Sequence, residues 1–366
     1  MSRDDGNSRI AVVIGTRPEI VKVAAIVRLL GKQARLIHTR QHSDEELSGV
    51  FLTGARLPEP ETLSGICGQP RHVQIGAMVE RLGGMFTERP PAAVVVQGDT
   101  NTVCAAAQAA NYSGVPVVHI EAGLRSLDRA MPEEINRCVT GVLADLHCAP
   151  TKRAVANLRR DGVPGEKIVL TGNTVVEATV SMLPDEATAS EIVAGLGAEP
   201  CEFALATIHR PENTDDPQRL RVILDELSKL GLPVLLPLHP RTRAAATRHG
   251  LTAALDRLRP IPPADHRTFL GLARHARLLV SDSGGVQEEC TVLKKPLIVV
   301  RNSTERPESI EAGFAHLVQP GPAIGELGRK LISDEGLGER LAAIPCPFGD
   351  GKATERIVAL LQAYLH

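Results

Sequence analysis

Short runs of hydrophobic, often β-branched residues alternate along the chain with segments whose hydrophobic residues recur every three or four positions. The first run, Ile10-Ala-Val-Val-Ile14, is followed by a polar turn and a helical pattern that extends to Leu30. Continuous hydrophobic runs separated by helices are typical of parallel strands buried on both faces. Further strands are therefore predicted at 35–38, 93–97, 115–120, 144–149 and 167–170.

A second series of the same kind follows a polar, turn-rich stretch at 182–190. Its strands are predicted at 203–207, 234–238, 278–280 and 297–300, and an amphipathic helix is predicted at 353–365. This order predicts an α/β protein with two Rossmann-like, doubly wound parallel-sheet domains and a ligand cleft at the strand ends. We expect an N-terminal domain at 1–170, a C-terminal domain at 171–351 and a final helix at 352–366.

Composition narrows the function classes. The chain has 366 residues, 43% hydrophobic and 23% charged, which suits a globular enzyme of two domains. A net charge of -2 gives no electrostatic basis for nucleic-acid binding. The polar N-terminus lacks a signal core, no run reaches membrane-spanning length, and the seven cysteines include no CxxC pair. We therefore expect a cytoplasmic protein with neither nucleic-acid nor membrane partners.

A phosphate-binding turn is predicted at Ser281-Asp-Ser-Gly-Gly-Val-Gln-Glu-Glu289, directly after a hydrophobic run. Its glycines let backbone N–H groups approach an anion, and the start of the following helix adds partial positive charge. The carboxylates one turn later would repel a phosphate but can accept hydrogen bonds from the neutral hydroxyls of a sugar. We interpret the segment as a nucleoside-diphosphate site, with the ribose on Glu288 or Glu289. Taken alone, it is equally an ordinary strand–turn–helix corner with a capping serine.

Polar clusters follow most of the other predicted strands as well. Asp99 and Glu121 each follow a hydrophobic strand, and two carboxylates facing one cleft raise each other's pKa and form a general acid/base set. Glu133 lies at the start of a helix, where a favourable helix-dipole interaction is an equally good explanation. A further cluster, His209-Arg-Pro-Glu-Asn213, follows the first strand of the second series.

No metal or redox cofactor is expected, because the sequence has no HExxH, no DxD and no GxGxxG motif. Backbone amides and the side chains of Arg17, Lys22 and Arg306 are left to neutralise the anion. Arg17 or Lys22 considered singly is more simply a solvated surface cation.

Together these segments resemble, in order and over nearly the whole chain, the bacterial and archaeal UDP-N-acetylglucosamine 2-epimerase family of the non-hydrolysing type. The segments that carry the resemblance are Gly15-Thr-Arg-Pro-Glu19 with Lys22, Gln41-His42, Gln97-Gly-Asp-Thr100, His119-Ile-Glu-Ala-Gly-Leu-Arg125, Pro132-Glu-Glu-Ile-Asn-Arg137, Ala149-Pro-Thr151, Gly172-Asn-Thr174, His209-Arg-Pro-Glu-Asn213, Ser281 to Glu289, and Thr304-Glu-Arg-Pro-Glu308.

The resemblance implies a GT-B fold with an interdomain active-site cleft, UDP held mainly by the C-terminal domain, and a final helix that packs back on the N-terminal domain. It implies UDP-N-acetylglucosamine as the substrate, no cofactor, and a homodimer. Phe269 would pack on uracil and Glu289 would bind the ribose. The implied catalytic residues are Asp99, Glu121, Glu133 and His209, and the implied substrate-binding residues are Arg17, Lys22, Arg137, Phe269, Ser283, Gly284, Gly285, Glu289 and Arg306.

The implied reaction is reversible C2 epimerisation to UDP-N-acetylmannosamine, by elimination of UDP to a glycal and its re-addition. The alternatives are a hydrolysing epimerase that releases N-acetylmannosamine and UDP, a GT-B glycosyltransferase that uses a UDP-sugar, and a catalytically silent nucleotide-binding regulator. Many bacterial members have Arg where Pro211 stands and a longer loop at 126–131. Some of them bind a second substrate molecule as an activator through these regions.

Overall fold

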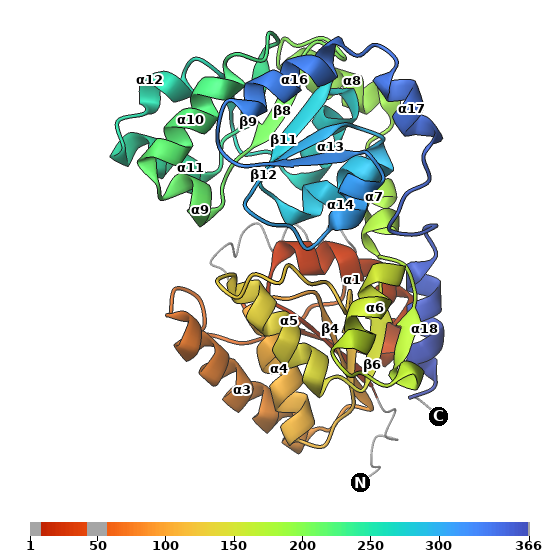
Figure 1. Cartoon of the computed structure of the whole chain (residues 1–366). Coiled ribbons are helices and arrows are strands. Elements are labelled where there is room, and N and C mark those ends of the chain that lie inside the picture. Colours follow the sequence, from red (N-terminus) through yellow and green to blue (C-terminus); the bar gives the residue numbers. More distant parts are fainter. Residues whose placement is uncertain (1–8, 42–56, 365–366) are drawn as a thin grey trace. The chain divides into compact units, whose positions relative to one another are not determined.

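The structure is a computed structural model, and it describes residues 9–41 and 57–364 (Figure 1). The described chain divides into two compact units. Unit 1 contains the described residues up to Ala178 and those from Phe348 onward, whereas unit 2 is Thr179–Pro347. The C-terminal helix is therefore part of unit 1.

Unit 1 is built on a parallel sheet. Its described residues form seven strands in the order β3-β2-β1-β4-β5-β6-β7. The direction of winding reverses between β1 and β4, which is the position where doubly wound sheets bind ligands. The strands are β1 (Ile10–Ile14), β2 (Ala34–His38), β3 (Glu61–Thr62), β4 (Ala93–Gln97), β5 (Val117–Ile120), β6 (Leu146–Ala149) and β7 (Ile168–Leu170).

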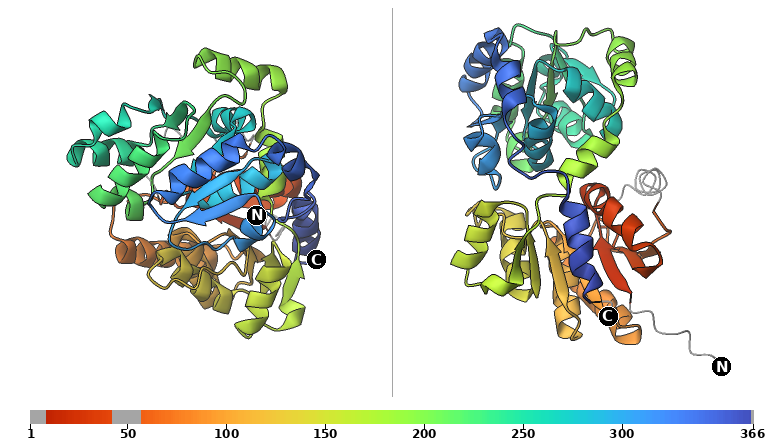
Figure 2. Two further views of the ribbon diagram at one scale, coloured as in Figure 1. Left: turned by 45° about the horizontal axis from the view of Figure 1, so that its top comes forward. Right: turned by 90° about the vertical axis from the view of Figure 1, so that its right-hand side faces the viewer.

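Helices cover both faces of this sheet. The α3 and α4 helices pack on one face, and α1 and α18 pack side by side on the other (Figure 2). The α7 helix leads into unit 2. The helices are α1 (Arg17–Leu30), α3 (Arg71–Glu88), α4 (Asn101–Tyr112), α5 (Pro132–Leu143), α6 (Lys152–Arg160), α7 (Val175–Met182) and α18 (Ala353–Gln362), with short 3-10 turns η1 (Gly31–Gln33) and η2 (Gly165–Lys167).

Unit 2 repeats this architecture. The sheet in its described residues has six parallel strands in the order β10-β9-β8-β11-β12-β13. Here the reversal lies between β8 and β11. The strands are β8 (Ala204–Thr207), β9 (Val234–Pro237), β10 (Arg259–Ile261), β11 (Leu278–Ser281), β12 (Leu297–Val300) and β13 (Ala315–Val318).

The helices of unit 2 also form two layers. One layer contains α10, α11, α12 and α16, and the other contains α8, α13 and α14. The bounds are α8 (Glu186–Gly195), α9 (Pro211–Thr214), α10 (Pro217–Leu227), α11 (Pro240–Arg248), α12 (Thr252–Leu255), α13 (His266–His275), α14 (Gly284–Leu293), α15 (Pro307–Glu311), α16 (Ala323–Ser333) and α17 (Leu337–Ala343).

The two parallel α/β units confirm the predicted fold class. The predicted central strands agree closely with the observed ones, but β3, β10 and β13 were not predicted. Most of the polar, turn-rich stretch at 182–190 belongs to α8, which begins at Glu186. The predicted C-terminal helix ends earlier, at Gln362, and residue 365 lies outside the described residues.

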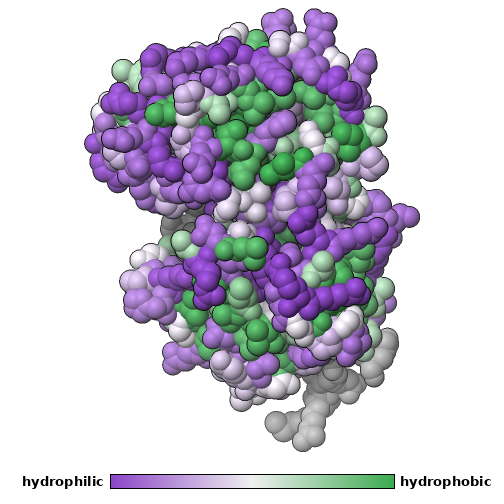
Figure 3. All heavy atoms as spheres, viewed as in Figure 1, coloured by the Kyte–Doolittle hydropathy of each residue, from purple (hydrophilic) through white to green (hydrophobic). Residues whose placement is uncertain are grey.

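Hydrophobic residues are interspersed among hydrophilic ones on the surface of both units that Figure 3 shows. In the described ranges, no helix combines the length and the hydrophobicity needed to cross a bilayer. All seven cysteines lie within these ranges and are free thiols, of which Cys104, Cys148 and Cys290 are buried.

Candidate functional site

In unit 1, a buried ion pair joins two of the predicted site residues. The Nζ of Lys22 on α1 lies 2.5 Å from Oε2 of Glu121, the residue that follows β5. Gln97, at the end of β4, donates its Nε2–H to the same oxygen at 2.8 Å. Because β1, β4 and β5 are neighbours in the sheet, side chains distant in sequence meet at their carboxyl ends. Lys22 was expected to bind diphosphate, and the structure places it on a predicted catalytic carboxylate.

The backbone of Glu121 adopts an unusual conformation. Its φ of 64° lies in the left-handed region, which costs a residue other than glycine about 1–2 kcal/mol. Such conformations persist where surrounding contacts hold them, and they cluster at functional sites. Here the contacts with Lys22 and Gln97 hold the carboxylate. The strand end thus presents an ordered carboxylate in place of the glycine that this conformation favours.

Asp99 is held by a different cation. Nη1 of Arg137 donates to Oδ2 of Asp99 at 2.5 Å, and Nε of Arg137 donates to Glu134 at 2.9 Å. The Arg137 side chain is buried, while that of Asp99 is 24% exposed. Two of the three predicted catalytic carboxylates, Asp99 and Glu121, therefore each have a cationic partner of their own.

Neighbouring glutamates at the start of α5 differ in environment. Glu133 is half-buried in the first turn, and no described residue forms a hydrogen bond or ion pair with its carboxylate. Glu134 is buried and accepts hydrogen bonds from the backbone N–H groups of Ser126 and Leu127, at 2.9 and 3.1 Å. Burial raises the pKa of Glu134, but these hydrogen bonds and the Arg137 charge outweigh it and lower the pKa overall. Glu134 thus anchors the short loop, and Glu133 remains available for chemistry.

Glu19 is a buried residue of this site that the sequence interpretation did not single out. Its Oε2 accepts hydrogen bonds from the N–H groups of Gly15 and Thr16 and from the Thr16 hydroxyl, at 2.7–3.0 Å. Its Oε1 accepts from the hydroxyl of Thr100 at 2.9 Å, which joins the turn after β1 to the turn after β4. Burial raises the pKa of Glu19 to about 7, against the lowering effect of the hydrogen bonds. The spacing of Thr16 and Glu19 is that of a capping box, a signal that was open to detection in the sequence.

His119, two residues before Glu121, has a structural role. The ring is buried, and its Nε2 lies 2.8 Å from the carbonyl oxygen of Gly98, next to Asp99. Burial lowers the pKa of His119 to about 3. The imidazole is therefore neutral at physiological pH and fixes the turn that carries Asp99.

In unit 2, His209 is positioned by Asp282, which is fully buried at the end of β11. The backbone N–H groups of His209 and Arg210 donate to Oδ2 of Asp282 at 3.0 and 2.9 Å, and the Nδ2–H of Asn213 donates at 3.1 Å. The Nδ1 of His209 lies 3.4 Å from Oδ1 of Asp282. The predicted catalytic histidine is thus joined to the turn that contains Ser283. Asp282 was not among the predicted site residues, although it directly follows a buried strand.

A second histidine flanks His209. The ring centroids of His209 and His239 are 5.4 Å apart. His239 precedes α11, and its Nδ1 accepts a hydrogen bond from the backbone N–H of Arg241 at 3.1 Å. The side chain of His209 is 36% exposed, so the pair is open to solvent on one side.

The predicted phosphate turn begins α14. Ser283 precedes the helix and makes no capping hydrogen bond through its side chain. Arg306 lies beside it: a Cβ atom added to Gly284 would be 2.8 Å from Nη1 of Arg306. The Arg306 guanidinium is buried and ion-paired with Glu305 and, at 2.8 Å, with Glu288. The structure thus places Arg306 beside the turn that contains Ser283 and Gly284.

Glu288 and Glu289 face different partners. Glu288 is fully buried against Arg306, whereas Oε1 of Glu289 lies 2.8 Å from Nε2 of His266. Of the two, only Glu288 is paired with a buried arginine. Phe269, on the same helix as His266, is half-buried against the core. Arg17 is half-buried as the first residue of α1, and His42 of the Gln41-His42 segment lies outside the described residues.

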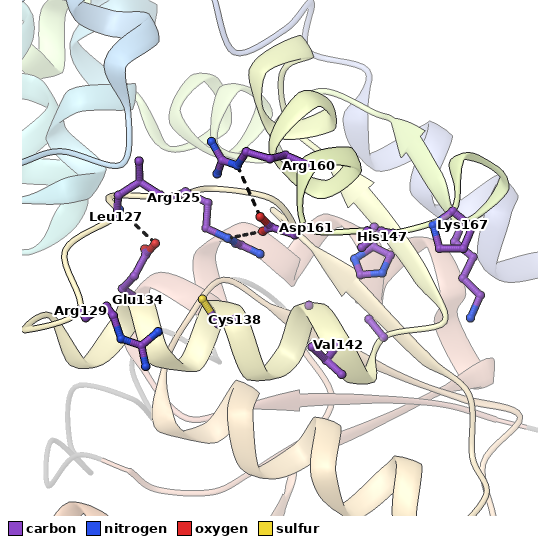
Figure 4. Close-up of a pocket in the computed structure, with 15 residues that line it drawn as sticks. Arg125, Leu127, Arg129, Glu134, Cys138, Val142, His147, Arg160, Asp161 and Lys167 are labelled. Carbon is purple, nitrogen blue, oxygen red and sulfur yellow. Dashed lines mark hydrogen bonds and ion pairs between the residues drawn. The ribbon is translucent and has the colours of Figure 1, made fainter.

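A pocket of about 510 Å³ lies elsewhere in unit 1, beside α5 (Figure 4). Its lining includes Arg125, Cys138, His147 and Asp161, and Nε of Arg125 donates to Oδ2 of Asp161 at 2.8 Å. None of the predicted catalytic or substrate-binding residues lines it. Among the residues that the structure describes, no group of three His, Cys, Asp or Glu side chains is arranged to hold a metal ion.

Comparison with known proteins agrees with the resemblance in sequence. Residues 28–362 match the family described as UDP-N-acetylglucosamine 2-epimerase. The UDP-N-acetylglucosamine 2-epimerase of Methanocaldococcus jannaschii is 37% identical, over 96% of this chain and 98% of that protein. A Pseudomonas aeruginosa relative that is 35% identical, over 96% of this chain and 99% of its own length, is a UDP-2,3-diacetamido-2,3-dideoxy-D-glucuronate 2-epimerase.

Solved structures also match this chain, and they include an enzyme of the same family. The crystal structure of the Methanocaldococcus jannaschii enzyme in complex with UDP-GlcNAc and UDP matches with a TM-score of 0.88 and 36% sequence identity. The match covers 97% of this chain and 99% of that one.

Proposed function

The chain belongs to the UDP-N-acetylglucosamine 2-epimerase family, and on this premise we propose that it interconverts UDP-N-acetylglucosamine and UDP-N-acetylmannosamine without net hydrolysis. The observation that carries the proposal is the ordered Glu121 carboxylate, which is held by Lys22 and Gln97 at the end of β5. A carboxylate held in a fixed position is one of the groups that can take the proton from a sugar carbon.

The nucleotide is assigned to unit 2. Ser283, Gly284 and Gly285 at the start of α14 would hold the diphosphate through backbone N–H groups and the helix dipole. Arg306 beside Gly284 would add positive charge, Glu289 would accept hydrogen bonds from the ribose, and Phe269 would pack on uracil. Arg17 is assigned to the same diphosphate.

The chemistry explains why a leaving group must be held. The C2 hydrogen of the sugar has no adjacent carbonyl, so it is barely acidic while UDP is attached. Breaking the bond between C1 and the diphosphate oxygen gives C1 oxocarbenium character, and a carboxylate then removes the C2 proton to leave a glycal. Protonation of C2 on the opposite face and return of UDP to C1 complete the inversion, with no net gain or loss of atoms.

Two faces of one carbon require at least two acid/base groups. Glu121, Asp99 and Glu133 are the proposed carboxylates, and His209 is the proposed fourth member of the set. Lys22 and Arg137 hold Glu121 and Asp99 in place through ion pairs. Asp282 holds the backbone of His209.

The alternatives differ in their products. A hydrolysing epimerase would release free N-acetylmannosamine and UDP. A GT-B glycosyltransferase would require an acceptor and would typically need one base instead of three carboxylates. A related sugar is a further possibility, because the Pseudomonas aeruginosa relative acts on a diacetamido-dideoxy-glucuronate nucleotide.

The test is to incubate the protein with UDP-N-acetylglucosamine and, separately, with UDP-2,3-diacetamido-2,3-dideoxy-D-glucuronate. The products are then separated by ion-pair chromatography. From UDP-N-acetylglucosamine we expect a stable mixture of UDP-N-acetylglucosamine and UDP-N-acetylmannosamine. Steady release of free sugar with UDP would contradict the non-hydrolysing proposal. Turnover of the glucuronate nucleotide alone would reassign the substrate.

A further inference from the structure

Glu289 lies one helical turn into α14 and stays close to the predicted phosphate turn. A Cβ atom added to Gly285 would lie 3.8 Å from Oε1 of Glu289, so the carboxylate points back toward the start of the helix. Glu289 is 8% exposed. A carboxylate this deeply buried needs a partner that fixes its direction.

His266, the first residue of α13, is that partner. Its Nε2 lies 2.8 Å from Oε1 of Glu289, and its Nδ1 lies 3.4 Å from the sulfur of Met182. An ionised carboxylate only accepts hydrogen bonds, so Nε2 of His266 is the donor whether the imidazole is neutral or charged. The two side chains are only 16% and 10% exposed, which protects the contact from competition by water.

The other carboxylate oxygen of Glu289, Oε2, has no hydrogen-bond or ion-pair partner within residues 9–41 and 57–364. His266 therefore fixes one oxygen of the carboxylate and leaves the other as an acceptor. An acceptor in this position, one turn from the diphosphate turn, suits a sugar hydroxyl of the nucleotide.

We infer that His266 is a positioning residue for nucleotide recognition, and that it orients Glu289 so that the enzyme selects ribose over deoxyribose. This inference rests on the proposed assignment of the nucleotide to unit 2. Without His266, the Glu289 side chain would turn freely, and ordering it on binding would cost affinity. The affected contact is the one to the 2′-hydroxyl, so the loss is specific to the ribonucleotide.

The experiment measures the affinities of UDP and dUDP by isothermal titration calorimetry. For the wild-type protein we expect UDP to bind about tenfold or more tightly than dUDP, because a hydrogen bond to an ionised group is lost with the 2′-hydroxyl. His266→Ala is expected to reduce this ratio to about threefold or less and to change dUDP affinity only about twofold. His266→Gln retains an N–H donor and is expected to restore most of the preference.

His249→Ala is the matched control. His249, which directly follows α11, also uses its Nε2 in a hydrogen bond within unit 2, at 3.2 Å from the carbonyl oxygen of Thr214. However, α11 covers the opposite face of the sheet from α13. This variant should keep the wild-type ratio, and urea unfolding of each variant checks the fold. An unchanged ratio in His266→Ala, or an equal loss of UDP and dUDP affinity, would overturn the inference alone. If the wild-type protein fails to bind UDP, the proposed function is overturned and this inference with it.

Discussion

At the scale of single residues, the site in unit 1 is a set of carboxylates held by different kinds of partner. Lys22 and Arg137 hold Glu121 and Asp99 by ion pairs, whereas Glu19 is held by backbone N–H groups and threonine hydroxyls. Charged hydrogen bonds of the first kind fix the direction of a carboxylate as well as its charge. The contacts of Glu19 instead fix the shape of the turn around it.

Replacing Glu121 with Gln tests whether this carboxylate transfers a proton and does not bind UDP. The change keeps the size of the side chain but removes its ability to take a proton. We expect kcat for epimerisation to fall by about 10²–10⁴-fold, the usual contribution of a general base. UDP affinity should change by less than about threefold, because this carboxylate acts on the reacting sugar. Exposed Glu166→Gln in the same unit is the control. A loss of UDP affinity as large as that of Arg306→Ala would mean that the roles are misassigned.

The raised pKa of Glu19 predicts that the stability of the protein depends on pH. Its pKa in the folded protein is raised from 4.5 to about 7, so between these values the folded state holds a proton that the unfolded state has lost. The contribution of Glu19 to stability is therefore greatest below about pH 4.5 and declines as pH rises toward 7, by up to about 3 kcal/mol.

Urea unfolding of the wild type and of Glu19→Gln at several pH values measures this effect. The wild type should lose stability relative to the variant between about pH 5 and pH 7, since Gln carries no titrating proton. A difference that stays constant across this interval would show that Glu19 is already ionised in the folded protein at pH 5.

At the scale of elements, the side chains of Arg306 and Glu305 lie so close to Gly284, at the start of α14, that a larger residue would not fit there. In Gly284→Ala, the new Cβ would lie 2.8 Å from Nη1 of Arg306 and 3.1 Å from Oε1 of Glu305. The guanidinium is buried and ion-paired on both sides, so it cannot move away at low cost. We expect UDP affinity to fall about tenfold, as measured by calorimetry.

Gly338→Ala, in α17, is the control for a glycine-to-alanine change in a helix of the same unit. A Cβ there meets no atom within 4 Å, so UDP affinity should be unchanged. Wild-type affinity in Gly284→Ala would mean that the position of Arg306 does not matter for the nucleotide.

The strands that the sequence did not reveal share one property. In the sheets of the described residues, β3, β10 and β13 are edge strands. Prediction relied on continuous hydrophobic runs, which mark strands covered on both faces. An edge strand such as β10 contains Arg259 and Pro260, and proline is tolerated there because one side of the strand is unpaired. Its pattern therefore resembles that of a loop.

Residue types at the strand ends could be predicted, but their pairings could not. Lys22 and Glu121 are 99 positions apart, and only the order of the strands brings them together. The same holds for His266 and Glu289, which join two helices of one layer. Sequence patterns indicate which residues reach the carboxyl end of a sheet, whereas contacts depend on the rotamers and packing of neighbouring elements.

At the scale of the whole molecule, the two units share one structural feature, a buried carboxylate at the point where the winding of the sheet reverses. In each sheet the winding reverses once, between β1 and β4 in unit 1 and between β8 and β11 in unit 2. At each reversal a buried carboxylate joins the two turns, Glu19 in the first unit and Asp282 in the second. Of the residues proposed for catalysis and nucleotide binding, Asp99 follows β4, His209 follows β8 and Ser283 follows β11, whereas Glu121 follows β5, the neighbour of β4. The reversal point thus accounts for the position of the chemistry in both units.

The most direct test of the proposed reaction is deuterium incorporation at C2 during turnover of UDP-N-acetylglucosamine in deuterated water, followed by NMR. We expect both recovered sugar nucleotides, UDP-N-acetylglucosamine and UDP-N-acetylmannosamine, to carry deuterium at C2, because the proton removed by one carboxylate is replaced from solvent. Interconversion of the two with the original hydrogen retained at C2, or no interconversion at all, would rule out the proposed reaction.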